Sequence, residues 1–427
     1  MNTRSTLLLF LAFFSRDVVA EAPLNAAATL PPGAKLAVIG DSITEQKLYS
    51  RYIEAYLVAC AGRADVHVFQ FGWGGETAGG FAGRAANDLS IFHPTTVTLC
   101  YGMNDGSYRP FDEKIGKNYE GSMRNVLNIL KANGVVHVVV GSPGAVDTFY
   151  FKNKNFGSKS GADGYNENLA QLGMIGKKLA GEFQQPFADV HQPMIDAMSK
   201  AKPVFGENYD VCGRDGVHPG PNGQLIMASA FLKGLGCNGD IGTITIDMNG
   251  PATATAGHKV VSSSAGAAEL ESERYPFCLQ GDDKSSNGTR SIAPHIGFNE
   301  QLNRYTLKVT NLNAAKAKVE WGGQAKEFTK EQLTSGINLA DFPATPFDSA
   351  FNSYLDKLGE KQGFETVAIK QLVTNFRQIS KDAKADPELA SALKNLGEKL
   401  AARQAALDTL ARKAITPVKH SLKVTPL

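Results

Sequence analysis

The stretch KLAVIGDSITE, residues 35–45, decides how this sequence is interpreted, because an apolar run stops at Gly-Asp-Ser and turns polar at once. The apolar residues at 36–39 predict a buried strand, and the residues after the serine can begin a helix. In parallel α/β sheets, functional side chains gather at the carboxyl ends of the strands. Ser42 is therefore either an ordinary helix cap or a nucleophile that the turn places there.

Apolar strands and amphipathic helices alternate through the first half of the sequence. Continuous apolar strands joined by helices are typical of a parallel sheet covered on both faces. The predicted strands cover residues 36–39, 66–71, 96–101, 135–140 and 187–190. The predicted helices cover residues 48–61, 81–89, 119–132, 165–183 and 224–235. We therefore predict one layered α/β domain over residues 35–238.

The pattern changes after residue 238. Alternating and β-branched residues, punctuated by Gly, Asn and Pro, predict an antiparallel β-rich domain at 239–341. Helical patterns fill 342–413, where leucines recur every three or four residues and predict an apolar helix face that packs within the chain or against a second copy. The alternating stretch VKHSLKV predicts that residues 414–427 return to the β-rich domain, which makes the helices an insertion. The alternative for this last segment is a frayed tail.

Composition and charge describe an ordinary globular protein of two or three domains. Hydrophobic residues make up 43% of the 427 residues, and the net charge of +2 gives no electrostatic reason to expect a nucleic-acid partner or an anionic membrane surface. Arg4, the apolar run LLLFLAFF and small residues before Glu21 predict a signal peptide at 1–20 and hence export to the periplasm or the medium. The alternative is a disordered apolar tail. No later stretch is long and apolar enough to span a membrane.

Five cysteines form neither a CxxC pair nor a metal-binding spacing. Export permits a disulfide, for which Cys212 and Cys237 are the first candidates because they flank one predicted helix. Burial as small hydrophobic side chains is the alternative. The sequence suggests no metal and no organic cofactor, and it leaves the oligomeric state open.

A serine nucleophile needs a base, because its hydroxyl is protonated near neutral pH. The segment DGVHP at 215–219 offers one: Asp215 and His218 lie three residues apart in a loop that contains Gly and Pro. Such a loop can fold back so that the carboxylate meets one imidazole nitrogen while the other faces outward. The alternative is a surface turn in which Asp215 caps the helix that follows.

Two further loops offer hydrogen-bond donors for a developing oxyanion. FGWGGET at 71–77 follows the second predicted strand, and its glycines let backbone N–H groups approach a ligand closely. YGMND at 101–105 follows the third strand and carries the Asn104 side-chain amide. Each loop alone is a weak signal, because a glycine-rich turn is usually only a turn and Asn-Asp usually only ends a strand.

Together these segments resemble the SGNH hydrolases, also called GDSL-type esterases and lipases. The resemblance covers residues 35–238 and rests on four ordered blocks: GDS at 40–42, GWGGET at 72–77, GMND at 102–105 and DGVH at 215–218. It implies a flavodoxin-like three-layer α/β sandwich, with Ser42 as nucleophile, His218 as base and Asp215 orienting that base.

The resemblance also implies an oxyanion hole made of the Ser42 and Gly75 backbone N–H groups and the Asn104 side chain. The glycine block of many members begins with Asn, whereas Gln70-Phe71 precedes Gly72 here. This departure loosens the alignment of Gly75.

The leading interpretation is an exported serine esterase that acts on carbohydrate O-acetyl groups or other short-chain esters. Trp73 and Tyr101 beside the donor loops could stack on a sugar or simply pack, and Asp41 and Met103 are further candidates for substrate contact. One alternative is a lysophospholipase or thioesterase. Another is a polysaccharide-binding or cell-surface protein in which the β-rich domain at 239–341 recognises the partner.

Overall fold

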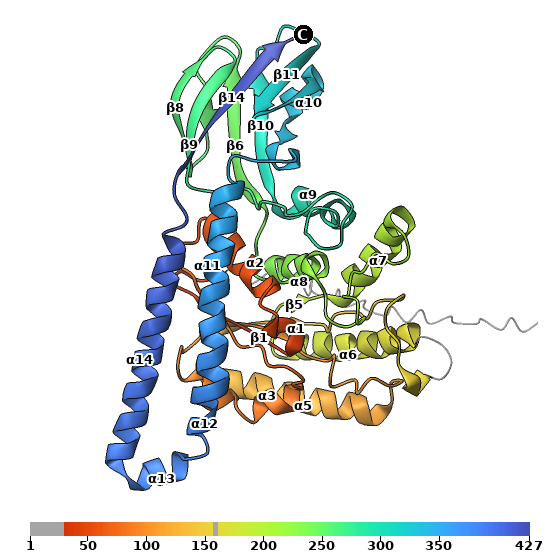
Figure 1. Cartoon of the computed structure of the whole chain (residues 1–427), viewed down its shortest axis with the longest axis vertical. Coiled ribbons are helices and arrows are strands. Elements are labelled where there is room, and N and C mark those ends of the chain that lie inside the picture. Colours follow the sequence, from red (N-terminus) through yellow and green to blue (C-terminus); the bar gives the residue numbers. More distant parts are fainter. Residues whose placement is uncertain (1–29, 157–160) are drawn as a thin grey trace, which may run out of the picture.

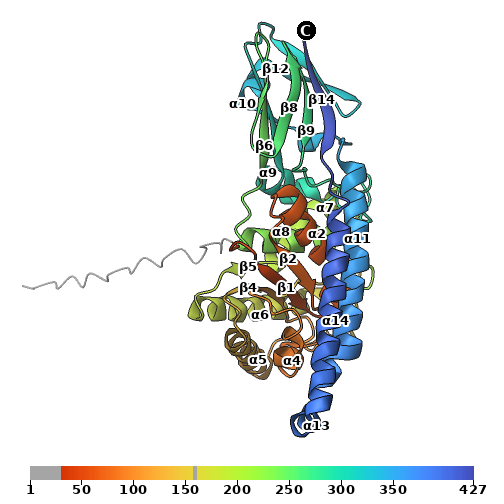
Figure 2. The ribbon, with the colours of Figure 1, turned by 90° about the vertical axis from the view of Figure 1, so that its left-hand side faces the viewer.

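The computed structural model describes residues 30–156 and 161–427, so the predicted signal peptide at 1–20 lies outside the described residues. Within the described ranges, none of the helices is both long and apolar enough to cross a membrane. The chain forms an α/β layer, a β-rich part at one end of it, and a long helical hairpin that runs beside the α/β layer (Figures 1 and 2).

The first sheet forms because five apolar segments pair side by side as parallel strands. Its order is β2-β1-β3-β4-β5, which leaves β2 at one edge. Alternate side chains of β1 face opposite layers: Leu36 and Val38 lie in one apolar core, and Ala37 and Ile39 lie in the other. The predicted α/β fold with a covered parallel sheet is confirmed. The strands are β1 Lys35–Gly40, β2 His67–Gln70, β3 Thr96–Cys100, β4 His137–Gly141 and β5 Phe187–Ala188.

Helices cover both faces of this sheet (Figure 1). The helices α2 and α8 pack together in the first core, whereas α3, α4 and α5 contribute to the second. These helices are α1 Ser42–Glu45, α2 Tyr49–Ala55, α3 Ala78–Ala82, α4 Ala85–Leu89, α5 Glu113–Ala132, α6 Ala162–Glu182, α7 His191–Phe205 and α8 Pro221–Gly234. The predicted helix at 81–89 is two short helices, because α3 ends at Gly83. The sequence did not predict α7, whose pattern is interrupted by Pro193 and Pro203.

The β-rich part consists of two sheets, ordered β13-β10-β6-β7 and β12-β11-β14-β9-β8. The antiparallel prediction is wrong for one pair, because β6 and β10 run parallel. Fifty-six residues separate these strands, ample length for the chain to cross back before β10 begins. Short helices α9 Phe298–Leu302 and α10 Lys330–Ser335 were also not predicted. The strands are β6 Asp240–Asp247, β7 Thr253–Ala254, β8 His258–Ser264, β9 Ala267–Ser272, β10 Arg304–Thr310, β11 Lys316–Trp321, β12 Gln324–Thr329, β13 Ile337–Asn338 and β14 Val418–Pro426.

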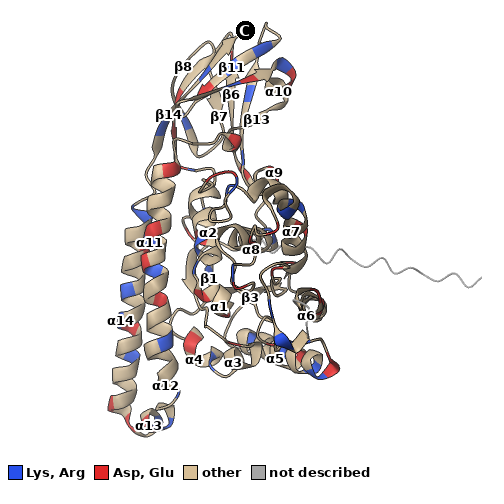
Figure 3. Cartoon of the chain, turned by 45° about the vertical axis from the view of Figure 1, so that its right-hand side comes forward, with Lys and Arg blue, Asp and Glu red and all other residues tan. Residues whose placement is uncertain are grey.

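A helical hairpin connects β13 to β14. Its elements are α11 Asp348–Val367, the π-helical segment Ala368–Val373, α12 Thr374–Phe376, α13 Ser380–Ala385 and α14 Pro387–Arg412. The two long helices pack against each other, and α11 also contacts α2 and β2. Charges of both signs are mixed along both helices (Figure 3). After α14, the chain returns to the five-stranded sheet of the β-rich part as β14, which lies between β11 and β9. The domain bounds stated above stay a prediction.

The apolar stripe predicted for the last helix does not form its buried face. Leu396 and Leu410 are 40% and 48% exposed, whereas Gln404, Asp408 and Ala411 are buried. The reason lies opposite them, where a buried polar network joins the hairpin to the α/β layer. The side chains that α14 buries toward α11 therefore include Gln404 and Asp408, which form hydrogen bonds and ion pairs in place of apolar contacts.

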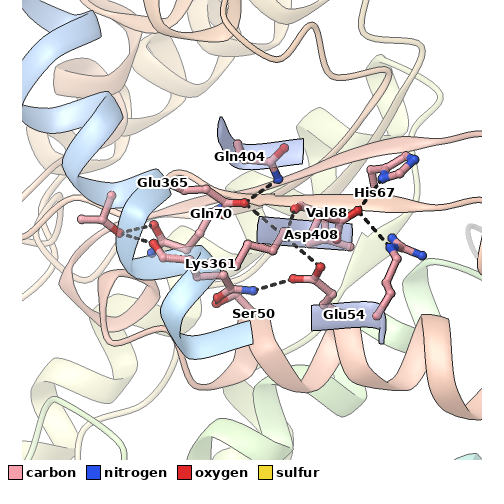
Figure 4. A network of polar contacts seen from close by, with 12 residues as sticks. Ser50, Glu54, His67, Val68, Gln70, Lys361, Glu365, Gln404 and Asp408 are labelled. Atoms are coloured by element: carbon pink, nitrogen blue, oxygen red, sulfur yellow. Dashed lines mark hydrogen bonds and ion pairs between the residues drawn. The ribbon is translucent and has the colours of Figure 1, made fainter. Parts of the chain in front are cut away.

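This network centres on Lys361, whose side chain is fully buried (Figure 4). Its Nζ lies 2.7 Å from Glu54 Oε1 on α2 and 3.1 Å from Glu365 Oε1 on its own helix, and it donates to Val68 O at 2.6 Å. Glu365 also accepts from Gln70 N at 2.9 Å. Val68 and Gln70 belong to the edge strand β2, so hairpin side chains satisfy backbone groups that would otherwise lack a neighbouring strand.

All five cysteines are free, and four of them are buried. The disulfide considered between Cys212 and Cys237 is not formed. Burial raises the pKa of the Cys237 thiol to about 12. The alternative reading, in which cysteines serve as small hydrophobic side chains, describes Cys60, Cys100, Cys212 and Cys278.

Candidate active site

Ser42 lies where β1 ends and α1 begins. The cap of this short helix is Asp41, whose Oδ1 accepts from Ile43 N at 2.9 Å, so the Ser42 hydroxyl is not used as a cap. Gly40 is required at the turn because a Cβ there would lie 2.1 Å from Thr44 Oγ1 and 2.7 Å from Cys100 O. The turn thus presents the serine side chain at the carboxyl edge of the sheet.

A continuous chain of hydrogen bonds runs from Ser42 to Asp215. Ser42 Oγ lies 2.7 Å from His218 Nε2, and His218 Nδ1 lies 2.6 Å from Asp215 Oδ2. In the tautomer that satisfies both contacts, Nδ1–H donates to Asp215 and Nε2 accepts from the serine hydroxyl. The structure therefore brings together three side chains from two loops that are 173 residues or more apart.

The Asp215 carboxylate holds the loop at 213–218 in shape through hydrogen bonds to its backbone. Asp215 Oδ1 accepts from the backbone N–H groups of Val217 and His218, both at 2.9 Å. Burial opposes ionisation, but these backbone bonds and the His218 ring together hold the pKa of Asp215 below its usual value. Gly213 and Gly216 adopt φ of +82° and +80°, and a Cβ on Gly213 would lie 1.9 Å from His218 O. Asp215 caps no helix, because α8 begins at Pro221 after Gly220.

The three expected oxyanion donors lie on the turn at Ser42 itself and on the two neighbouring loops. In the described part of the chain, the N–H groups of Ser42 and Gly75 donate to no protein oxygen. Gly75 is exposed with φ of +73°. The Asn104 amide donates one N–H to Glu76 O at 3.0 Å, and its Oδ1 accepts from the Tyr108 hydroxyl at 3.2 Å. The second amide N–H of Asn104 is thereby oriented and available.

Comparison with known proteins decides the identity of this layer. Residues 38–226 match the sequence model of the GDSL-like Lipase/Acylhydrolase family. This segment is a GDSL-type hydrolase domain. The acetylxylan esterase of Geobacillus stearothermophilus is 24% identical over 226 residues, which are 48% of this chain and 94% of that protein. By its match to this family, the segment belongs to a family of enzymes that hydrolyse ester bonds.

Two solved structures are similar to this chain, and the first of them shows how far the fold is shared. BT4096, a gut microbial diltiazem-metabolizing enzyme, is 20% identical with a TM-score of 0.71, and the match covers 95% of this chain and 100% of that one. The acetylxylan esterase Axe2 from Geobacillus stearothermophilus is 23% identical with a TM-score of 0.40 and covers 49% of this chain and 96% of its own. The likeness to BT4096 extends the shared fold beyond the GDSL-type domain into the C-terminal half.

Beneath the donor loops, the GDSL-type domain contains a buried acidic group. Burial, reinforced by the neighbouring carboxylates of Asp105 and Glu76, raises the pKa of Asp41 to about 7. Burial likewise raises the pKa of Asp105 to about 6. Glu76 is held by Arg84, whose Nε and Nη2 donate to its two carboxylate oxygens at 2.7 and 2.8 Å. These contacts fix the ends of the loops that carry Gly75 and Asn104.

Of the residues considered for substrate contact, only Trp73 is partly exposed. Tyr101 is fully buried and its hydroxyl donates to Glu76 Oε2 at 2.6 Å, so it packs beneath the site instead of facing a substrate. Asp41 and Met103 are only 3% and 2% exposed, so these side chains are also buried in the domain and do not face a substrate. We carry Trp73 alone forward as a candidate for substrate contact.

Sequence patterns missed two residues that touch the site. Tyr108 lies four residues beyond Asn104 and stacks on Tyr165 with ring centroids 5.1 Å apart. A tyrosine in a loop after a donor block was a weak signal for this role. Lys370 contacts Glu45 of α1 from the helical hairpin, 325 residues away along the chain. No local pattern identifies a contact across that distance.

Proposed function

We propose that this protein is an exported serine esterase in which Ser42, His218 and Asp215 form the catalytic triad. The hydrogen-bonded chain Ser42–His218–Asp215, with contacts of 2.7 and 2.6 Å, is the observation that carries the proposal. It joins an acceptor nitrogen to the serine hydroxyl and a carboxylate to the opposite ring nitrogen, which is the arrangement that activates a serine.

In this mechanism, His218 Nε2 takes the hydroxyl proton as Ser42 Oγ attacks the ester carbonyl carbon. The carbonyl electron pair moves onto oxygen, and the N–H groups of Ser42 and Gly75 and the Asn104 amide stabilise this oxyanion. The tetrahedral intermediate collapses, and the departing alcohol takes the proton from His218.

Water then attacks the acyl-serine ester while His218 takes one of its protons. Collapse of the second intermediate returns that proton to Ser42 and releases the carboxylic acid. Asp215 stays ionised throughout and stabilises the imidazolium form of His218.

For the substrate, we propose O-acetyl groups of carbohydrates or similar short-chain esters. The support is the acetylxylan esterase that is 24% identical over nearly the whole of its own length. Trp73 beside the donor loop is partly exposed, and the part of its side chain that Lys370 and Arg84 leave uncovered is available to contact such a substrate. Export rests on the signal-peptide pattern at 1–20.

The first test combines kinetics with active-site labelling. Ser42→Ala is expected to remove hydrolysis of p-nitrophenyl acetate, and a fluorophosphonate probe is expected to label the parent at Ser42. Ser199→Ala, at an exposed serine of α7, is the matched control and should react like the parent. Activity in Ser42→Ala equal to the parent, or labelling elsewhere, contradicts the proposed nucleophile.

Asp215→Asn tests the third member of the triad. The substitution keeps the loop's size but favours the wrong histidine tautomer, so kcat should fall by about 10³- to 10⁴-fold with the fold intact. Rates on acetylated xylo-oligosaccharides, lysophospholipids and acyl thioesters, measured with the same preparation, test the substrate class. Preference for either of the last two contradicts the carbohydrate assignment.

A further inference from the structure

Lys370 is the one residue of the π-helical segment Ala368–Val373 that forms an ion pair with α1. Its Nζ lies 2.6 Å from Glu45 Oε1, and the two side chains are only 22% and 24% exposed. Glu45 is three residues after Ser42, at the end of the same four-residue helix. A half-buried ion pair therefore connects the C-terminal hairpin to the element that carries the serine.

The other oxygen of Glu45 holds the glycine loop. Gly74 N donates to Glu45 Oε2 at 2.5 Å, directly before Gly75. A Cβ on Gly74 would lie 2.9 Å from Glu45 Oε2 and 4.0 Å from Ser42 Cβ, so this peptide runs close to the nucleophile. Glu45 is thus a bridge with Lys370 on one oxygen and the oxyanion loop on the other.

Lys370 also lies over the aromatic side chain of that loop. Its Nζ is 5.0 Å from the centroid of the Trp73 ring, and Arg84 Cζ is 4.6 Å from the same centroid. Both distances are within the range of a cation–π attraction. Lys370 therefore contacts the loop through Trp73 directly and through Gly74 by way of Glu45.

A second connection between the hairpin and α1 supports the same picture. Thr366 Oγ1 donates to Gln70 Oε1 at 3.0 Å, and Gln70 Nε2 donates to Thr44 O at 2.8 Å. This connection reaches the backbone of α1 at Thr44, whereas Lys370 reaches the side chain of its last residue, Glu45. The hairpin is consequently attached to α1 at two adjacent residues, Thr44 through Gln70 and Glu45 directly.

We propose that Lys370 is a positioning residue for ester hydrolysis, which acts through Glu45 to hold the Gly72–Gly75 loop in the conformation that presents its oxyanion donor. The inference rests on the proposed function of Ser42 and Gly75. A loop with three glycines in four residues has large backbone freedom, so fixed contacts at Trp73 and Gly74 decide where the next N–H points. The C-terminal hairpin thereby contributes to the active site without touching the substrate.

The test is Lys370→Met in the full-length protein. Methionine is close to lysine in length and carries no charge, so Trp73 loses its cation and Glu45 loses its ion pair while the hairpin keeps its packing. We expect kcat for p-nitrophenyl acetate to fall about 10-fold with KM changed less than about 2-fold, because the donor acts on the transition state. Lys394→Met is the matched control, since that lysine is 80% exposed on the same hairpin, and it should match the parent.

Two further readouts separate positioning from a general structural effect. Lys370→Arg should recover most of the lost kcat, because arginine can still pair with Glu45. The sequence contains two tryptophans, and Trp321 is 1% exposed, so a change in emission on removing Lys370 reports Trp73. We expect that change in Lys370→Met and not in Lys394→Met.

A double-mutant cycle with Glu45→Gln identifies the route. If Lys370 acts through Glu45, the double variant should lose no more kcat than Glu45→Gln alone. A Lys370→Met kcat within 2-fold of the parent, or fully additive losses in the cycle, overturns the inference. Fluorophosphonate labelling of the parent at Ser42 in the same experiment keeps these outcomes distinct from failure of the proposed nucleophile.

Discussion

Replacing Lys361 with methionine should destabilise the protein in a way that depends on pH. Lys361 is fully buried and its ammonium group is shared by two carboxylates, Glu54 at 2.7 Å and Glu365 at 3.1 Å. Burial raises the pKa of Glu54, and it raises the pKa of Glu365 to about 7 even with the lysine present. Without the lysine, both carboxyl groups must be neutral in the folded state.

The size of the effect follows from this proton uptake. Keeping one additional glutamic acid neutral at pH 7, against an ordinary pKa of 4.5, costs about 3.4 kcal/mol at about 1.36 kcal/mol per unit. The lost hydrogen bond to Val68 O adds about 1 kcal/mol. The total of about 4 kcal/mol agrees with the cost of about 3–5 kcal/mol for removing one partner of a buried ion pair.

The direction with pH follows from linkage. The folded variant binds more protons than the unfolded chain between pH 4.5 and pH 7, so its free energy of unfolding decreases as the pH rises. The deficit relative to the parent should therefore shrink by about 2.7 kcal/mol on going from pH 7 to pH 5. In the parent, Glu365 contributes stability that is present below its ordinary pKa and lost as the pH rises through about 7.

Calorimetric unfolding at pH 5 and pH 7 measures this difference. A loss of about 4 kcal/mol corresponds to a Tm lowered by about 8–16 °C for a cooperative unit of about 150–250 residues. Lys357→Met is the matched control, because Lys357 lies on the same helix in an exposed pair with Glu360 and should change stability by less than about 1 kcal/mol. Equal Tm deficits of Lys361→Met at both pH values would refute the proton-uptake reasoning.

The remaining predictions concern the donor loops. Tyr108→Phe removes the hydroxyl that orients Asn104, so kcat for p-nitrophenyl acetate should fall about 2- to 10-fold, the equivalent of one hydrogen bond of about 0.5–1.5 kcal/mol, and an unchanged kcat excludes this role. Gly75→Ala forces a side chain into φ of +73° at a strain of about 1–2 kcal/mol, although no atom lies within 4 Å of the added Cβ. Because that strain turns the Gly75 N–H away from its position, kcat should fall about 10-fold with intact folding, whereas parental kcat would show that turnover does not depend on the left-handed backbone at this position.

Local patterns were sufficient to predict the α/β layer. Each strand of the first sheet is buried on both faces, so it appears in the sequence as a continuous apolar run such as residues 36–39. The hairpin was predicted as helix but its buried face was not, because an apolar stripe is read as a packing face and here Gln404 and Asp408 are buried instead. Their partners lie on other elements, which no periodicity within one helix reports.

In the candidate site too, local sequence blocks could name some residues but not those that depend on distant contacts. Ser42, Asp215, His218 and Asn104 could be named because each stands in a short block after a predicted strand or in a turn of its own. Lys370 could not, since its role depends on a contact with a residue 325 positions away. Asp41 illustrates the opposite case: it was considered for substrate contact, but its carboxylate is occupied as the cap of α1.

The position of β14 has a consequence for how the protein is made. This strand lies between β11 and β9, yet it follows them in the chain by about a hundred residues or more. Until residues 418–426 leave the ribosome, the five-stranded sheet can exist only as two separate pairs, each with an uncovered edge that can pair with other chains. Synthesis of the hairpin comes between, and the end of α14 leads directly into β14. A nascent chain stalled within α14 would therefore carry a finished α/β layer beside an unfinished, aggregation-prone sheet.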